Sequence, residues 1–242
     1  MEEQKFYFQM EFLPLREAGT LLQNIPAMLS RTEQEKISGS CAKRQLEFLA
    51  GRICAKRAFL KLRSMKGKCS DIFIDTDLWG CPYVAGSNDF VSITHCDTMA
   101  AAVVSDIRYA RIAVDMEQIR AVKAGAEKRF LDEEEQKLLC GEAKENGFGE
   151  LAALCWSAKE SAGKLFQYGF GVCGILRIEQ IRMESSGIYE ISFHGLSLLQ
   201  VCGMIKKEHV VTMAAVFRRE LPEKSAENRN RLHSLLYSLP ID

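Results

Sequence analysis

The 242-residue chain has little of what zinc-finger, secreted or membrane proteins depend on. Its nine cysteines are never closer than twelve residues, so there is no CxxC pair, which argues against a zinc knuckle or a thioredoxin-type motif. No stretch approaches the run of about eighteen apolar residues that spans a membrane. The N-terminus is acidic rather than basic and does not resemble a signal peptide. We therefore expect a soluble, cytoplasmic protein with reduced thiols.

The chain also has no formal net charge, because 32 Lys and Arg residues balance 32 Asp and Glu residues. No global electrostatic field would recruit nucleic acid or an acidic membrane, so neither is expected as a partner and any steering must come from local patches. Hydrophobic residues at 47% and charged residues at 26% are typical of a globular protein. The length suffices for one large or two small domains with a proper core.

A pair of acidic residues stands in a short segment that alternates in polarity, residues 112–117. This alternation predicts a strand with Val114 and Met116 on one face. Asp115 and Glu117 then lie on the other face. Two acids placed in this way more often belong to a solvated sheet face than to a metal site, so both interpretations stay open.

Trp156, Glu160 and Lys164 follow one another at intervals of four residues in a segment that is predicted to be helical. This spacing places all three on one helix face. A Glu four residues before a Lys is also an ordinary helix-stabilising pair, and a Trp on such a helix most often packs in the core. If this face meets the two strand acids, three carboxylates and a lysine form a site for a hard cation and a phosphate.

The predicted elements form two similar series. The first has a strand at 6–12, a helical region at 32–63 and strands near 71–76, 90–94 and 99–105. The second has a strand at 111–117, helices at 132–144 and 150–168, and strands near 175–182, 188–193 and 209–217. A faint repeat lays Lys56 over Lys164 and the strand 100–104 over 211–216, with the boundary near residues 108–109. The tail from residue 221 shows a helical spacing of leucines and is assigned no function.

Four segments carry a resemblance to one family. They are Gly80-Cys81-Pro82, Ser92-Ile93-Thr94-His95-Cys96, Val114-Asp115-Met116-Glu117 and the segment from Trp156 to Lys164. They are similar, in this order, to Gly-Lys-Pro, Asn-Ile-Ser-His-Ser, Ile-Asp-Ile-Glu and Trp-Ser-x-Lys-Glu-Ser-x-x-Lys of the phosphopantetheinyl transferases. The chain resembles specifically the long monomeric type, typified by the surfactin-synthetase activator.

This resemblance implies an α+β fold of two pseudo-symmetric halves, each a small, mostly antiparallel sheet packed against a long helix, with the active site between the halves. Residues 1–108 would form the N-terminal half, on the side of the coenzyme A nucleotide. Residues 109–220 would form the C-terminal half with the metal and catalytic residues, and 221–242 a helical tail. A monomer is expected, because a chain with two halves supplies its own cleft.

The activity implied is transfer of the phosphopantetheine arm of coenzyme A to a serine of an apo acyl, peptidyl or polyketide carrier protein, with release of adenosine 3′,5′-bisphosphate. Asp115, Glu117 and Glu160 would hold Mg²⁺. Glu160 would also accept the serine proton, and Lys164 would stabilise the leaving phosphate. Two alternatives remain: a Mg²⁺-dependent enzyme acting on another nucleotide, and a degenerate module that binds carrier proteins or coenzyme A without turnover. Which carrier is modified is left open.

For the nucleotide end of coenzyme A, the resemblance implies contacts from Thr94 and His95. Cys81 departs from the family pattern, because a thiol cannot supply the charge of the usual lysine. Arg52 and Lys56 stand four residues apart on one helix face and are expected to compensate, although a solvated basic face is the ordinary meaning of such a pattern.

Glu135 corresponds to an acid of the family, but its place after Asp132 is also typical of a capping box, so its part in the chemistry stays open. Lys159 points about 100° away from Glu160 on the helix. It is expected to be an exposed lysine or an ion-pair partner.

Overall fold

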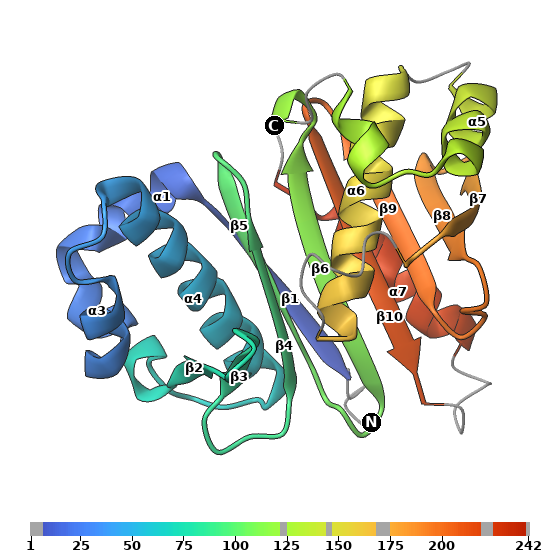
Figure 1. The fold of residues 1–242 in the computed structure, drawn as a ribbon. Coiled ribbons are helices and arrows are strands. Elements are labelled where there is room, and N and C mark those ends of the chain that lie inside the picture. The colour runs from blue at the N-terminus through green and yellow to red at the C-terminus, as the bar shows by residue number, and fades with distance from the viewer. Residues whose placement is uncertain (1–6, 122–124, 144–146, 168–174, 219–224, 241–242) are drawn as a thin grey trace. The chain divides into compact units, whose positions relative to one another are not determined.

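The computed structural model describes residues 7–121, 125–143, 147–167, 175–218 and 225–240. The chain forms two compact units, residues 1–112 and 113–242, and each is described by itself (Figure 1). No helix among the described residues is both long enough and apolar enough to cross a membrane.

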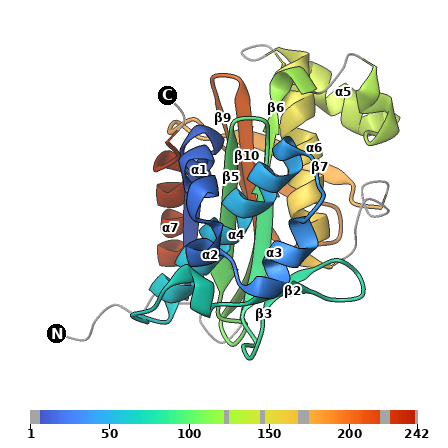
Figure 2. The same cartoon turned by 90° about the vertical axis from the view of Figure 1, so that its left-hand side faces the viewer.

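The first unit is a five-stranded antiparallel sheet in the order β1-β5-β4-β3-β2. Its strands are β1 (Phe8–Pro14), β2 (Ile74–Thr76), β3 (Pro82–Val84), β4 (Phe90–His95) and β5 (Met99–Ser105). Its helices are α1 (Leu15–Leu21), α2 (Ile25–Met28), α3 (Arg31–Ile37) and the long α4 (Ala42–Leu62), with 3-10 turns at Leu22–Asn24 and Cys69–Asp71. Figure 2 shows these helices covering one face of the sheet.

Small side chains allow α4 to lie close to the sheet of the first unit. Ala100 and Ala102 of β5 are fully buried in the same core cluster as Leu49 and Ile53 of α4. A Cβ atom on Gly51 would lie 2.8 Å from a methyl group of Ile93, so a glycine is needed where α4 passes over β4. This close approach brings the polar residues of α4 to the edge of β4, where His95 ends the strand.

The second unit repeats this arrangement with a sheet in the order β6-β10-β9-β8-β7. Its strands are β6 (Ala110–Gln118), β7 (Ile178–Met183), β8 (Ile188–Phe193), β9 (Gln200–Lys206) and β10 (His209–Phe217). Its helices are α5 (Glu133–Glu142), the long α6 (Phe148–Leu165), which packs on β9 and β10, and α7 (Ser225–Tyr237), with 3-10 turns at Ile119–Ala121 and Ala126–Arg129. The division between the units falls within β6, after Ile112.

The two sheets have the same topology, since β6 takes the place of β1 and β10 the place of β5. The predicted α+β fold, with two similar halves each built on a long helix, is therefore confirmed. The location of the active site between the halves stays a prediction.

The register of the repeat that the sequence indicated is wrong. Lys56 does not correspond to Lys164, because Lys56 and Lys159 play the same part in their units. Each donates a hydrogen bond to a buried glutamate, Glu33 in one unit and Glu135 in the other, that belongs to a capping box. Aligning Lys56 with Lys159 also pairs Glu47 with Glu150 and Lys61 with Lys164, so the residue of α4 that corresponds to Lys164 is Lys61.

Some elements differ from the sequence prediction. The helical region 32–63 is two helices, because Gly39, with φ of +82°, turns the chain between α3 and α4. The strands β3 and β9 and the short helices α1 and α2 were not predicted. In the tail, α7 packs against β9 and β10, and Leu232, Leu236 and Leu239 of the tail are buried. The sequence also favours Gly169 as the C-cap of the predicted helix 150–168, but Gly169 lies outside the described residues.

Candidate functional site

The accessible face of α6 is a stripe of three residues, the same three that the four-residue spacing in the sequence placed on one helix face. Between Leu151 and Leu165 every residue is buried except Trp156, Glu160 and Lys164, which are half-buried. The apolar and small residues around them pack the helix onto its sheet. The polar atoms of this stripe are therefore the only ones along this part of α6 that face outward from the core.

The stripe meets the acids of β6 within the second unit. Lys164 Nζ lies 2.6 Å from Asp115 Oδ1 and donates a second hydrogen bond to the Val114 carbonyl at 3.2 Å. Trp156 Nε1 donates a hydrogen bond to Glu117 Oε1 at 3.1 Å. The strand acids thus face the helix rather than forming a solvated surface, and Asp115 is only 4% exposed.

The acids of this cluster repel one another. The pKa of Glu117 is raised to about 7, mainly by burial and then by the negative charge of Asp115, with a smaller contribution from Glu160. The Trp156 hydrogen bond and Lys164 act in the opposite direction. Three carboxylates with one lysine would gain from a further cation. A set of carboxylate oxygens is what a hard divalent cation such as Mg²⁺ prefers, so these residues fit a magnesium ion.

The three carboxylates are not gathered into a closed ligand cage. Asp115 is turned toward Lys164 and Glu117 toward Trp156, so their oxygens are directed at separate donors. Among the described residues, three potential ligand atoms within 4.8 Å of one another occur instead at Glu184, Glu190 and His233.

The carboxylates of that second group are already paired with arginines. Arg182 lies 3.2 Å from Glu190 and 3.8 Å from Glu184, and Arg229 lies 3.4 Å from Glu190. These ion pairs give the group a structural role that ties α7 to β8.

Glu135 and Lys159 form part of the scaffold. Glu135 is 2% exposed and completes the predicted capping box with Asp132, accepting the Asp132 amide at 2.8 Å. Its other oxygen accepts the amide of Ile178, and Lys159 Nζ lies 2.7 Å from it. The ion-pair interpretation of Lys159 is confirmed and the exposed one is wrong, because α6 turns this residue toward α5.

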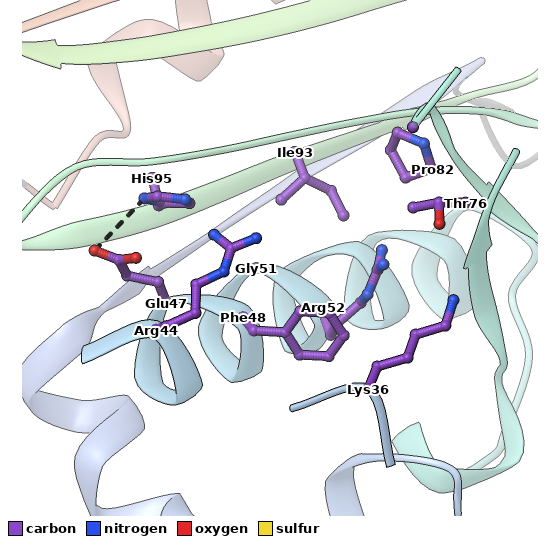
Figure 3. Close-up of a pocket in the computed structure, with 11 residues that line it drawn as sticks. Lys36, Arg44, Glu47, Phe48, Gly51, Arg52, Thr76, Pro82, Ile93 and His95 are labelled. Atoms are coloured by element: carbon purple, nitrogen blue, oxygen red, sulfur yellow. Dashed lines mark ion pairs between the residues drawn. The ribbon is translucent and has the colours of Figure 1, made fainter. Parts of the chain in front are cut away.

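A pocket of about 380 Å³ lies in the first unit, between α4 and the ends of β2, β3 and β4 (Figure 3). Three of its lining residues are cations, Lys36, Arg44 and Arg52, and His95 adds a titratable ring. Glu47 faces His95, with 3.9 Å between Oε1 and Nδ1. The pocket is therefore suited to an anion.

The predicted nucleotide-site residues separate into two groups. Arg52 and His95 line the pocket. Thr94 does not, because neighbouring strand residues point to opposite faces and its side chain is buried. Lys56 also lies outside the lining: it is fully buried, and its ammonium donates to Glu33 Oε2 at 2.5 Å and to the Met28 carbonyl at 3.0 Å. The expectation that Lys56 supplies charge to the pocket is corrected, because α2 and α3 cover it.

Cys81 stands between two residues of the pocket lining, Gly80 and Pro82. The turn around it is held by Asp77, whose Oδ1 accepts the Cys81 amide at 2.8 Å, and Gly80 has a φ of +83° that favours glycine. The turn supplies no cation, so the positive charge of the pocket comes from the helices.

Sequence reasoning missed Lys36 and Glu33. Lys36 reaches the pocket from α3 and is ion-paired with Asp75. Glu33 is fully buried behind the pocket. The sequence carries a signal for Glu33, since Ser30 three residues before it is a capping-box pattern.

Both units match models of known protein families. Residues 32–105 match the family model described as the 4′-phosphopantetheinyl transferase N-terminal domain, and residues 111–214 match that of the 4′-phosphopantetheinyl transferase superfamily. A holo-[acyl-carrier-protein] synthase of Enterococcus faecalis is 42% identical over 93 residues, which are 36% of this chain and 77% of that protein. One of Shouchella clausii is 36% identical over 85 residues, 32% of this chain and 73% of that protein.

Among solved structures, the chain is matched in part by the holo-(acyl-carrier-protein) synthase of Bacillus anthracis in complex with CoA (3′,5′-ADP). It is 26% identical, with a TM-score of 0.38, and the match covers 40% of this chain and 91% of that one. The two family models together account for most of this chain, and the Enterococcus relative is matched over more than two thirds of its length. The chain therefore belongs to the 4′-phosphopantetheinyl transferase superfamily.

Proposed function

We propose that this protein transfers the phosphopantetheine arm of coenzyme A to a serine of an apo carrier protein. Membership of the superfamily and the relatives named holo-[acyl-carrier-protein] synthase support this reaction. The observation that carries the proposal is the contact between the α6 stripe and the β6 acids, where Lys164 bonds Asp115 and Trp156 bonds Glu117. A purely structural helix face would have no need to bond two strand acids through a lysine and a tryptophan, with a third carboxylate, Glu160, between them on the same face.

In this proposal Asp115, Glu117 and Glu160 would hold Mg²⁺. The ion would supply charge neutralisation on the pyrophosphate of coenzyme A. Two of the three acids already have donors on α6 that orient them, which is how metal ligands are commonly held.

Lys164 is the group that would stabilise the leaving phosphate. Its side chain is 30% exposed, while its carboxylate partner is only 5% exposed, so its ammonium is the more accessible member of the pair. Negative charge develops on the leaving adenosine 3′,5′-bisphosphate, and a cation placed there acts mainly in the transition state. Glu160, one helical turn before Lys164, would accept the proton of the attacking serine.

The pocket of the first unit would bind the nucleotide end of coenzyme A. Arg44, Arg52 and His95 supply donors suited to phosphate oxygens, and Cys81 supplies none. Thr94 would contribute through the shape of β4 rather than through its hydroxyl. The acceptor would be an acyl carrier protein, with peptidyl and polyketide carriers as further candidates, and the active protein would be a monomer.

The test is intact-mass spectrometry of an apo acyl carrier protein after incubation with the enzyme, coenzyme A and Mg²⁺. The expected result is a mass gain of one phosphopantetheine arm, absent when the carrier serine is replaced by alanine. Formation of a carrier complex without a mass gain would favour the binding-module alternative. Hydrolysis of coenzyme A without carrier modification would favour a different Mg²⁺-dependent enzyme.

A further inference from the structure

Among the described residues, each unit contains a buried ion pair of the same kind. In each, a glutamate at the third position of a short helix closes a capping box and pairs with a lysine in the middle of the long helix. In each, that lysine also donates to the backbone carbonyl five residues before the glutamate. The pairs are Glu33 with Lys56 and Glu135 with Lys159.

The two pairs differ at the second carboxylate oxygen. Glu135 Oε1 accepts the amide of Ile178 at 2.8 Å, so the second unit satisfies its glutamate completely. Glu33 Oε1 is buried with no hydrogen-bond donor among the described residues, and Arg52 Nε lies 3.9 Å from it. Arg52 stands four residues before Lys56, where the second unit has the neutral Cys155. The first unit therefore has one cation beside its buried ion pair that the second unit lacks.

This group of three carries a net positive charge. Glu33 and Lys56 have fully buried side chains and that of Arg52 is 7% exposed, so one carboxylate faces two cations in the interior. Burial lowers the pKa of Arg52, with the charge of Arg44 adding to this effect, while Glu33 and Asp75 oppose it. An arginine nevertheless stays protonated in a protein, and a buried unbalanced charge is costly without a counter-ion. The group is therefore short of one negative charge.

The geometry directs Arg52 toward the pocket. Its guanidinium carbon lies 4.8 Å from the centre of the Phe48 ring, which restricts the plane of the group. Figure 3 shows the side chain reaching from α4 toward Thr76 and Pro82 on the opposite wall. With Nε turned to Glu33, the two terminal nitrogens are the atoms that can meet an anion, and a guanidinium binds phosphate through such paired donors.

We propose that Arg52 is the residue of this pocket that binds a phosphate of coenzyme A, and that Glu33 and Lys56 are positioning residues that hold it there. The inference rests on the proposed function and assigns the anchoring charge to one side chain. Lys56 neutralises one oxygen of Glu33 and fixes the carboxylate, and the other oxygen faces Arg52 Nε. The phosphate then supplies the missing negative charge, so the three residues act as one unit.

The experiment measures steady-state constants and calorimetric coenzyme A binding for Arg52→Gln, Glu33→Leu/Lys56→Leu and the triple variant. The double variant replaces a buried pair by apolar groups, which disturbs the fold less than removal of one partner, because no buried charge of the pair is left alone. Arg52→Gln should raise the KM for coenzyme A roughly tenfold, the value of a charged hydrogen bond, with kcat and the KM for the carrier unchanged. The double variant should show a similar rise, and the triple variant less than about a twofold further rise.

Two further variants keep the test decisive. Glu33→Asp keeps the charge, withdraws the carboxylate from Arg52, and should raise the KM for coenzyme A several-fold even if the double variant does not fold. Glu11→Gln removes a carboxylate from the ion pair with Lys61 in the same unit, away from the pocket lining, and should leave every constant unchanged.

An unchanged KM in Glu33→Asp, or effects of Arg52→Gln and the double variant that simply add, would overturn the inference. A wild-type protein without transferase activity would refute the proposed function instead. In that case the same variants still report on the inference through their calorimetric affinity for coenzyme A.

Discussion

Replacing Trp156 by phenylalanine isolates the link between α6 and the strand acids. The change removes one hydrogen bond, from Nε1 to Glu117 Oε1 at 3.1 Å, and keeps an aromatic ring on the helix. The Trp156 ring packs edge-on against Phe130 with 4.9 Å between centroids, a contact that phenylalanine can make in part. Because Trp156 is half-buried, we expect the fold to lose no more than about 1 kcal/mol.

The effect on metal binding should be larger. This hydrogen bond favours the charged form of Glu117 and fixes the direction of its carboxylate, whereas burial and Asp115 work against the charge. A hydrogen bond to a charged group is worth about 1.5–3 kcal/mol, and loss of an outer partner of a metal ligand typically weakens metal affinity 10- to 100-fold. Since the site is partly exposed, we expect the low end of this range, about tenfold.

The assay is carrier modification as a function of Mg²⁺ concentration, with metal affinity also followed by calorimetry. Trp156→Phe should raise the half-saturating Mg²⁺ concentration about tenfold and recover most of the wild-type rate at saturation. The other tryptophan of the chain provides the matched control, because Trp79 is 85% exposed and lies in the first unit. A Mg²⁺ dependence in Trp156→Phe equal to that in Trp79→Phe would refute the assignment of Glu117 as a ligand.

Four further predictions concern individual side chains. Asp115→Asn should abolish turnover without unfolding the protein, and near-normal activity in saturating Mg²⁺ would contradict the metal assignment. Lys164→Ala should lower kcat more than it weakens coenzyme A binding, whereas lost calorimetric binding with an unchanged kcat would make it a ground-state ligand. His95→Ala should raise the KM for coenzyme A more than that for the carrier, and Cys81→Lys should lower it several-fold; no change in either variant would remove the segment from the site. The Arg108 hydrogen bonds and the charge of Arg63 hold the pKa of Asp106 at about 2. Urea unfolding at pH 7 should therefore show Asp106→Asn to be less stable than the wild type by about 2 kcal/mol. This difference should disappear as the pH falls from about 4 to about 2.

The stripe on α6 and the alternation on β6 could be predicted because both are local patterns. A spacing of four residues fixes a helix face, and an alternation fixes a strand face, whatever the rest of the chain does. The capping box at Asp132 is local for the same reason, and it indicated that Glu135 closes a helix end. The α+β fold of two halves came from the resemblance, which carries topology that no single segment encodes.

Whether a charged side chain is buried or reaches a pocket could not be predicted from such local patterns. Arg52 and Lys56 share a helix face, yet one lines a pocket and the other is fully covered, because α2 and α3 pack over only one end of the face. The role of Glu33 likewise depends on a partner 23 residues further along the chain. Long-range packing of this kind is decided by tertiary contacts rather than by spacing.

The most direct test of the metal site, on which the proposed chemistry depends, is a crystal of the protein grown with coenzyme A and Mn²⁺ in place of Mg²⁺. The account predicts an anomalous scattering peak from a Mn²⁺ ion that is coordinated by carboxylate oxygens of Asp115, Glu117 and Glu160. A peak at Glu184, Glu190 and His233 with none at these three acids would contradict it.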